Sequence, residues 1–233
     1  KVAALRRKPA EFFRVDIGDG VELDGWRLEP PDMEPGRRYP LLMHVYGEPA
    51  GQTVLDRWGG NNHLWHLMLA QRGYVVASVD NRGTPAPRGR AWRKSIYRQI
   101  GILASQDQAA AVRRLREWPF VDPARVGSWG WSGGGQMTLN ALFRYPDLYS
   151  TGIAVAFVSD QRLYDTIYQE RFMARPEDNP EGYRLGSPIT FADQLKGNLL
   201  IVHGTGDDNV HYQSAERLID ALVKAKKRFT MMA

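Results

Sequence analysis

Near-continuous apolar runs alternate along this chain with segments in which apolar residues recur every three or four positions. The runs are typical of strands buried on both faces of a parallel sheet, and the other segments have the period of amphipathic helices. We therefore predict an α/β fold with a mostly parallel, doubly wound sheet. Strands are expected at 41–46, 74–79, 126–131, 152–158, 199–203 and from 229, and helices around 64–68, at 106–118, after 135 and at 214–226.

The N-terminal part differs from the rest, because two β-rich segments flank a Gly-Asp-Gly turn at 18–20. Glycine supplies the positive φ that such a turn needs, so 11–17 and 21–28 are predicted to form an antiparallel hairpin at the N-terminal edge of the sheet. Two further stretches are expected to be irregular. These are a turn at 122–125 and the aromatic, proline-rich segment 159–196, which we expect to fold over the functional site.

The sequence Gly130-Trp131-Ser132-Gly133-Gly134 lies between an apolar strand and a helix. A strand that runs through Gly-x-Ser-x-Gly into a helix predicts a nucleophile elbow, the turn of the α/β-hydrolase fold. The serine needs a positive φ there, and glycines two positions on either side leave space for it. The helix N-terminus then points unpaired N–H groups at the place where an oxyanion would form. The alternative, a flexible glycine loop, is disfavoured by the flanking strand and helix.

A carboxylate is expected at the same edge of the sheet as Ser132. Functional groups of such sheets lie beyond the carboxyl ends of the strands, where Tyr46, Val158 and Asp207 are also predicted. A serine hydroxyl needs a histidine to remove its proton, and that histidine needs a carboxylate to orient it. Asp207 is the preferred candidate, because it is the first acidic side chain clear of its strand. Asp208 is the alternative and is expected instead to stabilise the turn.

The histidine of this triad is not evident. In the α/β-hydrolase order it follows the acid, on the loop after the next strand, which here begins at Phe229. His211 is the only histidine after Asp207, and it is too close to Asp207 in sequence to bridge to Ser132. We therefore expect the base beyond Ala233, and we expect the chain to be a fragment that is inactive by itself.

The remaining histidines have simpler interpretations. His63 and His66 lie three positions apart on one predicted helix, but no carboxylate is spaced to complete a metal site with them. We predict solvated or half-buried side chains for this pair. His44 and His203 lie in or at the ends of buried strands, where hydrogen-bonded core histidines are expected. No metal or organic cofactor is implied.

The composition fits one globular domain over residues 1–233, with 43% hydrophobic and 24% charged residues. The chain has no cysteine, which excludes disulfides, thiolate metal sites and a cysteine nucleophile. It has no apolar run as long as a membrane span, and segment 1–10 lacks the apolar centre of a signal peptide. These features assign no compartment. The sequence does not exclude a targeting segment before Lys1, because the chain does not begin with Met.

Basic residues outnumber acidic ones by 31 to 26, which gives a net charge of +5. The densest basic run, 88–98, raises the question of nucleic-acid binding. Small and apolar residues interrupt this run, and no nucleic-acid-binding motif surrounds it. A solvated loop, or a surface against another domain, is the preferred interpretation, and no nucleic-acid partner is expected.

Several linked motifs together resemble the catalytic domain of the prolyl oligopeptidase family of serine peptidases, and most of all its dipeptidyl-peptidase-IV branch. They follow one another in the same order from about Tyr39 to the end of the chain, which makes the resemblance specific. The motifs are segment 41–49, Asp80-Asn81-Arg82-Gly83, Gly130-Trp131-Ser132-Gly133-Gly134, segment 153–159 and segment 203–211.

The resemblance implies a peptidase that removes short N-terminal units from peptides, cutting after proline or a small residue. Ser132 would be the nucleophile and Asp207 the acid, and the oxyanion hole would combine the Gly133 N–H with the Tyr46 hydroxyl. A tyrosine donor also suits the residues themselves, because no His-Gly-Gly-Gly loop is present to supply a second backbone donor. The alternative for Tyr46 is a core aromatic.

The resemblance also implies a pocket for the residue before the cut bond, with Asn209 binding a substrate carbonyl. Its aromatic and aliphatic walls would suit a flat pyrrolidine ring. Two tyrosines four positions apart are equally typical of a buried helix face. The walls would be formed by Trp131, Val158, Tyr164, Tyr168 and Val210.

Three residues depart from the pattern of this branch. Gly133 stands where the branch usually has tyrosine and Gln161 where it has tryptophan, so two aromatic walls are lost. Glu48 replaces a small residue in the loop beside Tyr46. Strict specificity for proline is therefore not implied, even where peptidase chemistry is.

The family also carries an N-terminal β-propeller, which admits only short peptides and supplies acidic side chains for their free amine. Short peptides and this domain of the same polypeptide are the implied partners, and a homodimer is left open. Two alternatives remain: a carboxylesterase or acylaminoacyl-type hydrolase with the same triad, and a non-catalytic α/β-hydrolase-fold module used for binding. Propeller repeats upstream would favour the peptidase over the esterase. The retention of Ser132, Asp207 and Tyr46 argues against the binding module.

Overall fold

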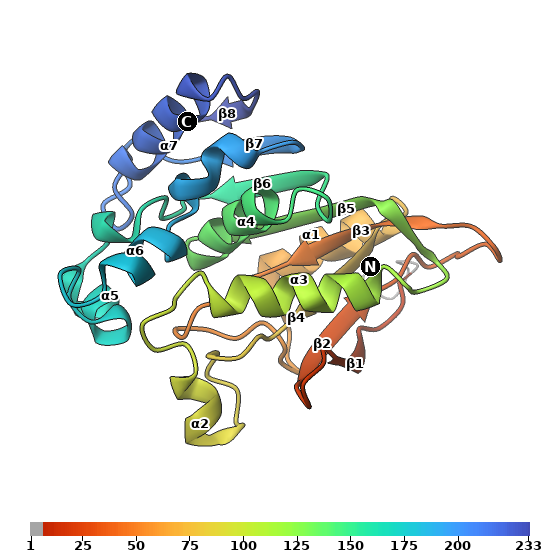
Figure 1. Cartoon of the computed structure of the whole chain (residues 1–233). Helices are drawn as coiled ribbons and strands as arrows, with labels where there is room; N and C mark the ends of the chain where they lie inside the picture. The colour runs from red at the N-terminus through yellow and green to blue at the C-terminus, as the bar shows by residue number, and fades with distance from the viewer. Residues whose placement is uncertain (1–6) are drawn as a thin grey trace.

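A single eight-stranded sheet runs through the molecule, in the order β1-β2-β4-β3-β5-β6-β7-β8 (Figure 1). The structure is a computed structural model that describes residues 7–233. Residues 1–6, part of the segment considered above as a signal peptide, lie outside the described residues. Only β2 runs antiparallel to its neighbours, which confirms the mostly parallel α/β sheet with an N-terminal hairpin. The strands are β1 (Glu11–Asp16), β2 (Glu22–Leu28), β3 (Tyr39–His44), β4 (Val75–Val79), β5 (Val121–Trp131), β6 (Thr151–Val155), β7 (Asn198–Val202) and β8 (Thr230–Met232).

Helices cover both faces of this sheet. The helix α1 contacts β2 and β4 on one face, whereas α3, α4 and α7 contribute to the core on the other face (Figure 1). The helices are α1 (Gly60–Gln71), α2 (Gly89–Lys94), α3 (Leu103–Leu115), α4 (Gly133–Arg144), α5 (Thr166–Met173), α6 (Pro180–Gly186) and α7 (Gln213–Lys224), with two 3₁₀ segments, η2 (Gln161–Leu163) and η3 (Pro188–Gln194).

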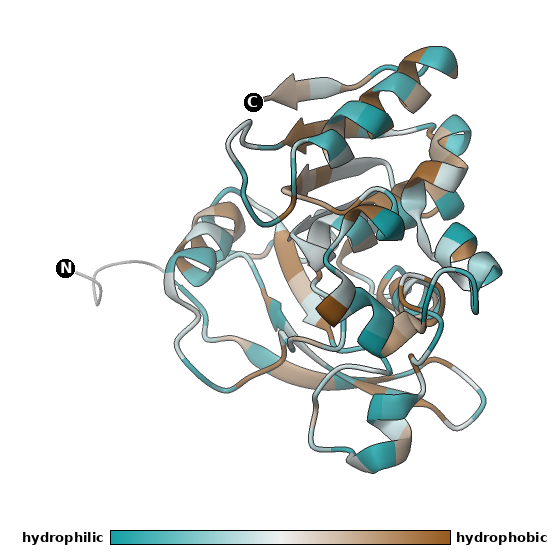
Figure 2. Cartoon of the chain, turned by 90° about the vertical axis from the view of Figure 1, so that its left-hand side faces the viewer, coloured by the Kyte–Doolittle hydropathy of each residue, from teal (hydrophilic) through white to brown (hydrophobic). Residues whose placement is uncertain are grey.

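The central strands are apolar on both faces because both faces are covered. All five residues of β4 are buried. Val75 and Ala77 belong to the core that includes residues of α3 and α4, whereas Val76 between them packs with Leu67 and Ala70 of α1. Figure 2 shows hydrophobic colour along the inner strands and hydrophilic colour mainly on helices and loops. The near-continuous apolar runs therefore have the two-sided burial that the pattern predicts.

The prediction of an irregular segment at 159–196 is wrong in part, because this segment contains α5, α6, η2 and η3. These elements are short, so they lack the long amphipathic pattern by which helices are recognised. In η2, α5 and α6 a capping side chain accepts a backbone N–H from the first turn: Asp160 from Arg162, Asp165 from Tyr168 and Asn179 from Gly182. The Ser187 side chain before η3 makes no such hydrogen bond.

The turn predicted at 122–125 is instead a bulge within β5. In the pairing with β3, these residues stand opposite Pro40 alone. Proline has no N–H to give to the ladder, and the Asp122 carboxylate accepts the Ala124 N–H at 3.0 Å. The segment thus uses the hydrogen bonding of a turn without ending the strand.

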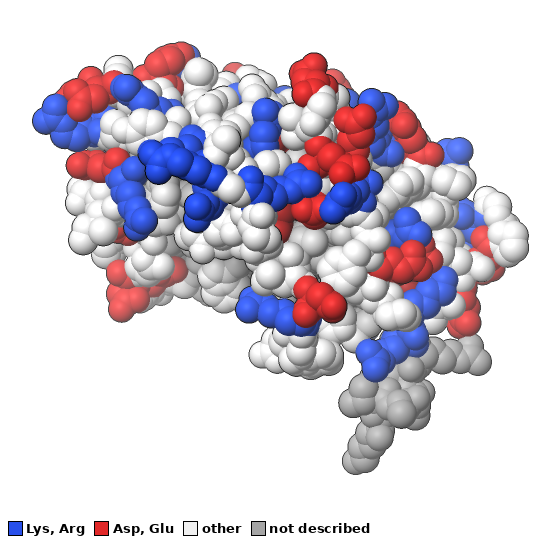
Figure 3. All heavy atoms as spheres, turned by 90° about the horizontal axis from the view of Figure 1, so that it is seen from below, with Lys and Arg blue, Asp and Glu red and all other residues white. Residues whose placement is uncertain are grey.

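The basic run 88–98 is partly helical, because it contains α2, none of whose residues is buried. Figure 3 shows Lys and Arg side chains gathered on this side of the molecule, with acidic side chains among them. A surface cavity of about 530 Å³ lies there, lined in part by Arg90, Arg93, Lys94 and Arg171. Among residues 7–233, no helix is long and apolar enough to cross a membrane.

Candidate active site

Ser132 stands at the junction between β5 and α4, with φ 57° and ψ −120°. Its backbone N–H donates to the carbonyl of Val155 in the neighbouring strand at 2.9 Å, and its own carbonyl accepts the Gln136 N–H at 3.1 Å. The residue is therefore held by the sheet on one side and by the first turn of the helix on the other. This strained backbone turns the half-buried hydroxyl out at the carboxyl edge of the sheet.

Two glycines make this junction sterically feasible. A Cβ added to Gly134 would overlap the carbonyl oxygen of Val45, and one added to Gly130 would overlap the backbone of Gly134. The end of β3, the end of β5 and the start of α4 therefore approach one another more closely than side chains would allow. This close approach brings the residues after β3 next to Ser132.

Replacing Gly134 by alanine should destabilise the fold, because the new methyl group has to displace backbone. We expect the free energy of unfolding to fall by about 1–3 kcal/mol, as it does in overpacked cores. Differential scanning fluorimetry should show this as a lower apparent melting temperature. Gly204→Ala is the matched control, since no atom lies within 4 Å of its added Cβ. Equal melting temperatures for the two variants would contradict the close approach at Gly134.

Tyr46 lies beside Ser132 in the structure. Both residues, together with Trp131, line a cavity of about 270 Å³. Burial, followed by the negative charge of Glu48, raises the pKa of Tyr46 to about 12. The phenol therefore keeps its proton near neutral pH and can donate a hydrogen bond into the cavity. The first N–H groups of α4, beginning with Gly133, have no partner within the helix, so two kinds of donor lie next to the Ser132 hydroxyl.

The loop that carries Tyr46 is anchored by the residues that follow β4. The Asp80 carboxylate accepts the backbone N–H groups of Thr53 at 2.8 Å and Val54 at 3.1 Å. Asn81 donates through its side-chain amide to the carbonyl of Gly47 at 3.0 Å. These contacts fix both ends of the loop, which explains why the motif after β4 belongs to the site without touching Ser132.

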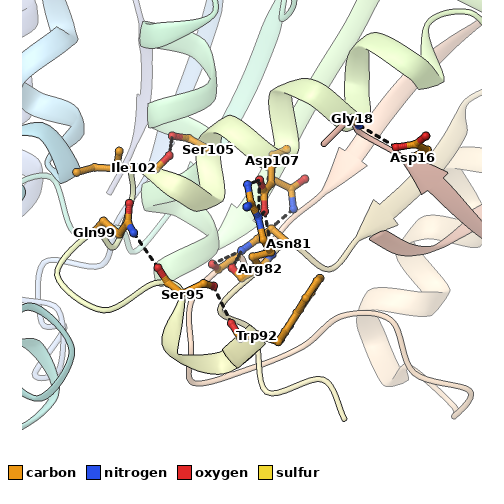
Figure 4. Close-up of polar contacts among 12 residues, drawn as sticks. Asp16, Gly18, Asn81, Arg82, Trp92, Ser95, Gln99, Ile102, Ser105 and Asp107 are labelled. Atoms are coloured by element: carbon orange, nitrogen blue, oxygen red, sulfur yellow. Dashed lines mark hydrogen bonds and ion pairs between the residues drawn. The ribbon is translucent and has the colours of Figure 1, made fainter. Parts of the chain in front are cut away.

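Arg82 ties this motif in turn to α3. Its side chain pairs with Asp107 at 2.6 Å, and its backbone N–H donates to the same carboxylate at 3.0 Å (Figure 4). On the same helix, the Gln108 amide donates to the Asn81 side chain at 3.1 Å. The loop beside Ser132 is thus supported by a chain of polar contacts that reaches from β3 to α3.

Asp207 lies on the loop after β7, at the same edge of the sheet. One of its oxygens, Oδ1, accepts the backbone N–H groups of Asn209 at 3.1 Å and Val210 at 2.9 Å. Among the described residues no group donates to Oδ2 within hydrogen-bonding distance, and His203 Nε2 is 3.7 Å away. Asp208 is exposed. Asp207 is therefore the better oriented of the two carboxylates, with one oxygen left for a further partner.

None of the five histidines, all of them among the described residues, lies within hydrogen-bonding distance of the Ser132 hydroxyl. His211 is exposed on the loop of Asp207. His203 is buried, and its Nε2 lies 2.7 Å from the carbonyl of Val210, as predicted for a core histidine. Ser132 and Tyr46 thus line one cavity, Asp207 lies on a loop at the same edge of the sheet, and none of the described histidines contacts the Ser132 hydroxyl.

The prediction of solvated or half-buried side chains is confirmed for His63, which is half-buried, but it is wrong for His66, and the prediction of a hydrogen-bonded core histidine is wrong for His44. His66 is buried and accepts a hydrogen bond from the Trp129 indole at 3.1 Å. His44 stacks on the same indole at 4.7 Å, but its Nδ1 is buried without a hydrogen-bond partner among the described residues. Burial lowers the pKa of His44 to about 4 and that of His66 to about 3. Within the described part of the chain, no cluster of three metal-ligating side chains includes them.

The residues proposed for the substrate pocket fall into two groups. Tyr164 donates to the Asn209 side chain at 3.1 Å, and its ring lies 5.5 Å from that of Tyr168 in an edge-to-face arrangement. Tyr164 precedes α5, so the two tyrosines do not share a buried helix face. Val158 and Val210 are buried, whereas Trp131 is 63% exposed and lines the cavity with Tyr46 and Ser132.

The three departures from the family pattern lie in different surroundings. Gln161 is fully buried and donates to the carbonyl of Ile100 at 2.7 Å, so it is part of the core. Glu48 is buried beside Gly133, and it accepts a hydrogen bond from the Tyr168 hydroxyl at 2.8 Å. In the sequence, Glu48 differs from the small residue of the family pattern only in its size and charge. Its contact with Gly133 could not be read from the sequence.

Comparisons with known proteins place the chain in a family. A family model described as the prolyl oligopeptidase family matches residues 63–233. The probable dipeptidyl peptidase 4 of Aspergillus flavus is 38% identical over 216 residues, which cover 91% of this chain and 28% of that protein. The probable dipeptidyl-aminopeptidase B of Emericella nidulans is 40% identical over 225 residues, covering 95% of this chain and 24% of that protein.

A crystal structure of Porphyromonas gingivalis dipeptidyl peptidase 4 matches with a TM-score of 0.94 and 47% sequence identity, covering 99% of this chain and 32% of that chain. This match confirms the α/β-hydrolase fold. The chain spans about a quarter to a third of the length of the proteins it matches.

Proposed function

The chain belongs to the prolyl oligopeptidase family of serine peptidases, and we propose that it is a catalytic domain that cleaves peptide bonds through an acyl-enzyme on Ser132. The observation that carries this proposal is the strained Ser132 at the start of α4, in one cavity with Tyr46. The Ser132 oxygen attacks the scissile carbonyl, and its proton passes through a base to the leaving amine. Water then hydrolyses the ester and restores the serine.

The Gly133 N–H and the Tyr46 hydroxyl are proposed to bind the oxyanion of the tetrahedral intermediate. A donor in this role must stay protonated, and the pKa of about 12 keeps Tyr46 neutral over the working range of such enzymes. Asp80 and Asn81 support this role by fixing the loop in place before the substrate arrives. Little reorganisation is then needed when negative charge develops.

Replacing Tyr46 by phenylalanine should lower the rate of the chemical step by about 10²–10³-fold, the usual effect of removing one oxyanion donor. The ring and its packing remain, so the melting temperature should not change. The measurement is kcat for a dipeptidyl amide, with single-turnover kinetics to isolate acylation. An unchanged acylation rate would make Tyr46 a structural aromatic.

The general base is proposed to be a histidine in the remainder of a longer polypeptide. The support for this proposal is that Asp207 presents one oxygen without a donor among the described residues. The share of the relatives' length that this chain covers, 24–28%, leaves room for such a residue and for further domains. We propose that the chain alone is inactive and that a propeller domain of the same polypeptide limits access to short peptides.

Removal of dipeptides from free N-termini is the proposed reaction. Its support is that the matched proteins carry the names dipeptidyl peptidase and dipeptidyl-aminopeptidase. We propose that Val158, Tyr164, Tyr168 and Val210 enclose the residue before the cut bond, which would be proline or a small residue, and that Asn209 binds a substrate carbonyl. The comparisons do not favour a carboxylesterase or a non-catalytic binding module.

A panel of three substrates tests this proposal on the full-length polypeptide. The substrates are a Gly-Pro chromogenic amide with a free amine, its N-acetylated form and a short-chain aryl ester. We expect cleavage of the free-amine amide and not of the acetylated form, because a dipeptidyl peptidase recognises the α-ammonium group. Cleavage of the ester alone would overturn the peptidase assignment, and cleavage of both amides would overturn the exopeptidase assignment.

A further inference from the structure

Glu48 occupies space directly beside the residue that follows the nucleophile. A Cβ built on Gly133 would lie 2.5 Å from Glu48 Cδ and 2.8 Å from both Cγ and Oε2. The absence of a side chain at position 133 is therefore what lets the Glu48 carboxyl group lie there. The two departures from the family pattern are coupled in space, although 85 positions separate them along the chain.

The Glu48 carboxyl group has no cationic partner within the described part of the chain. Its only hydrogen bond there comes from the Tyr168 hydroxyl, which donates to Oε2 at 2.8 Å. Burial raises the pKa of Glu48 to about 7, and this hydrogen bond only partly opposes the effect. Burial and then the charge of Glu48 also raise the pKa of Tyr168. A carboxylate in such a place is stabilised by any cation that a ligand brings to it.

Resting on the proposed peptidase function, we propose that Glu48 extends the specificity of the site beyond proline and small residues, by pairing with a lysine or arginine side chain of the substrate residue before the cut bond. The substrate carbonyl would sit against the Gly133 N–H, and the side chain nearest to that carbonyl belongs to this residue. Tyr46, Tyr164 and Tyr168 are grouped around the carboxyl group. Aromatic walls would cover the alkyl stem, while the cationic end reaches Glu48.

Two dipeptide p-nitroanilides of nearly equal shape, Ala-Arg and Ala-citrulline, differ in the positive charge of the second side chain. Ala-Pro p-nitroanilide is the reference substrate. In the full-length polypeptide at pH 8 we expect kcat/KM for Ala-Arg to exceed that for Ala-citrulline by about tenfold or more, as for one buried charge-assisted contact. Glu48→Gln should bring this ratio close to one and retain cleavage of Ala-Pro. Glu170→Gln, the same change two positions beyond Tyr168 on α5, should keep the ratio of the unmodified protein.

The pH dependence provides a second measurement that needs no variant. The carboxylate is the form that pairs with a cation, and it is depleted below the raised pKa of about 7. The ratio of kcat/KM for Ala-Arg over Ala-citrulline should therefore be close to one well below pH 7, rise as the pH passes through about 7 and level off at its full value above it. In Glu48→Gln the ratio should not vary with pH. Should this variant fail to cleave Ala-Pro, a flat profile in the unmodified protein would overturn the proposal.

The remaining outcomes separate this inference from the proposed function. An equal loss for Ala-Arg and Ala-citrulline in Glu48→Gln would mean that Glu48 binds the α-ammonium group common to both, which overturns the side-chain pairing. Cleavage of all three substrates with a ratio near one would overturn this inference and leave the peptidase standing. Cleavage of none of them by the unmodified protein would overturn the proposed function itself.

Discussion

Replacing Ser132 by alanine should abolish hydrolysis of dipeptidyl amides in the full-length polypeptide, with a loss of kcat on the order of 10⁶-fold. The reason is that no other group can form the acyl-enzyme. The φ of 57° at this position disfavours any residue with a Cβ, but serine already bears that strain. Alanine adds no atoms, so the elbow and the helix that follows it should persist. The measurement is the residual rate, read beside the melting temperature.

Residual activity helps to interpret this result. If only the nucleophile is lost, the oxyanion donors and the binding pocket remain, and a background on the order of 10³–10⁴-fold over the uncatalysed rate can persist. A double variant, Ser132→Ala with Tyr46→Phe, should reduce this background further. Full activity in Ser132→Ala would place the nucleophile elsewhere.

The elbow could be predicted from the sequence because its determinants are local. Glycines at 130 and 134, a strand before them and a helix after them lie within a dozen residues, and each has a direct conformational reason. The place of Asp207 at this edge was also within reach, since its loop follows the buried strand β7. A parallel sheet puts the carboxyl ends of its strands at one edge, so position along the chain already implies position in space.

What the sequence did not predict depends on contacts between distant segments. Asp80 anchors a loop about 27 positions earlier, and this contact exists only because β3 and β4 are adjacent and in register. His66 was expected to be solvated or half-buried because no carboxylate is spaced to form a metal site with it, yet its side chain is buried and accepts a hydrogen bond from Trp129 on a distant strand. The same holds for Glu48, because the position of its carboxyl group depends on the missing side chain at Gly133.

Local signals also failed where elements are short. Segment 159–196 contains helices of seven and eight residues, α6 and α5, which are capped by Asn179 and Asp165. A hydrophobic period cannot be recognised over two turns, whereas the capping residues and the proline after Asn179 were available as signals. α5 matters to the site, because it carries Tyr168 to the Glu48 carboxyl group.

Replacing Asp207 by asparagine should lower kcat of the full-length polypeptide by about 10⁴-fold, as expected when a catalytic histidine loses the carboxylate that fixes its tautomer. The asparagine oxygen can still accept the backbone N–H groups of Asn209 and Val210. The loop should therefore keep its conformation. The amide nitrogen that replaces Oδ2 is a donor and cannot accept a hydrogen bond from a histidine N–H, so the defect should be confined to catalysis. A melting temperature equal to that of the unmodified protein would show that the loop is intact.

Asp208→Asn is the comparison that assigns the acid. Asp208 is exposed and one position away, so its replacement removes the same charge from the same loop without removing the oriented oxygen. We expect less than about a tenfold change in kcat, since screened surface charges act weakly. A reversed pair of effects would move the acid to Asp208, and small effects in both variants would exclude this loop as the source of the triad carboxylate. Because Asp207 Oδ1 is already held by two backbone donors, the side chain is fixed before any histidine arrives. That preorganisation is the physical reason for expecting the large effect at Asp207.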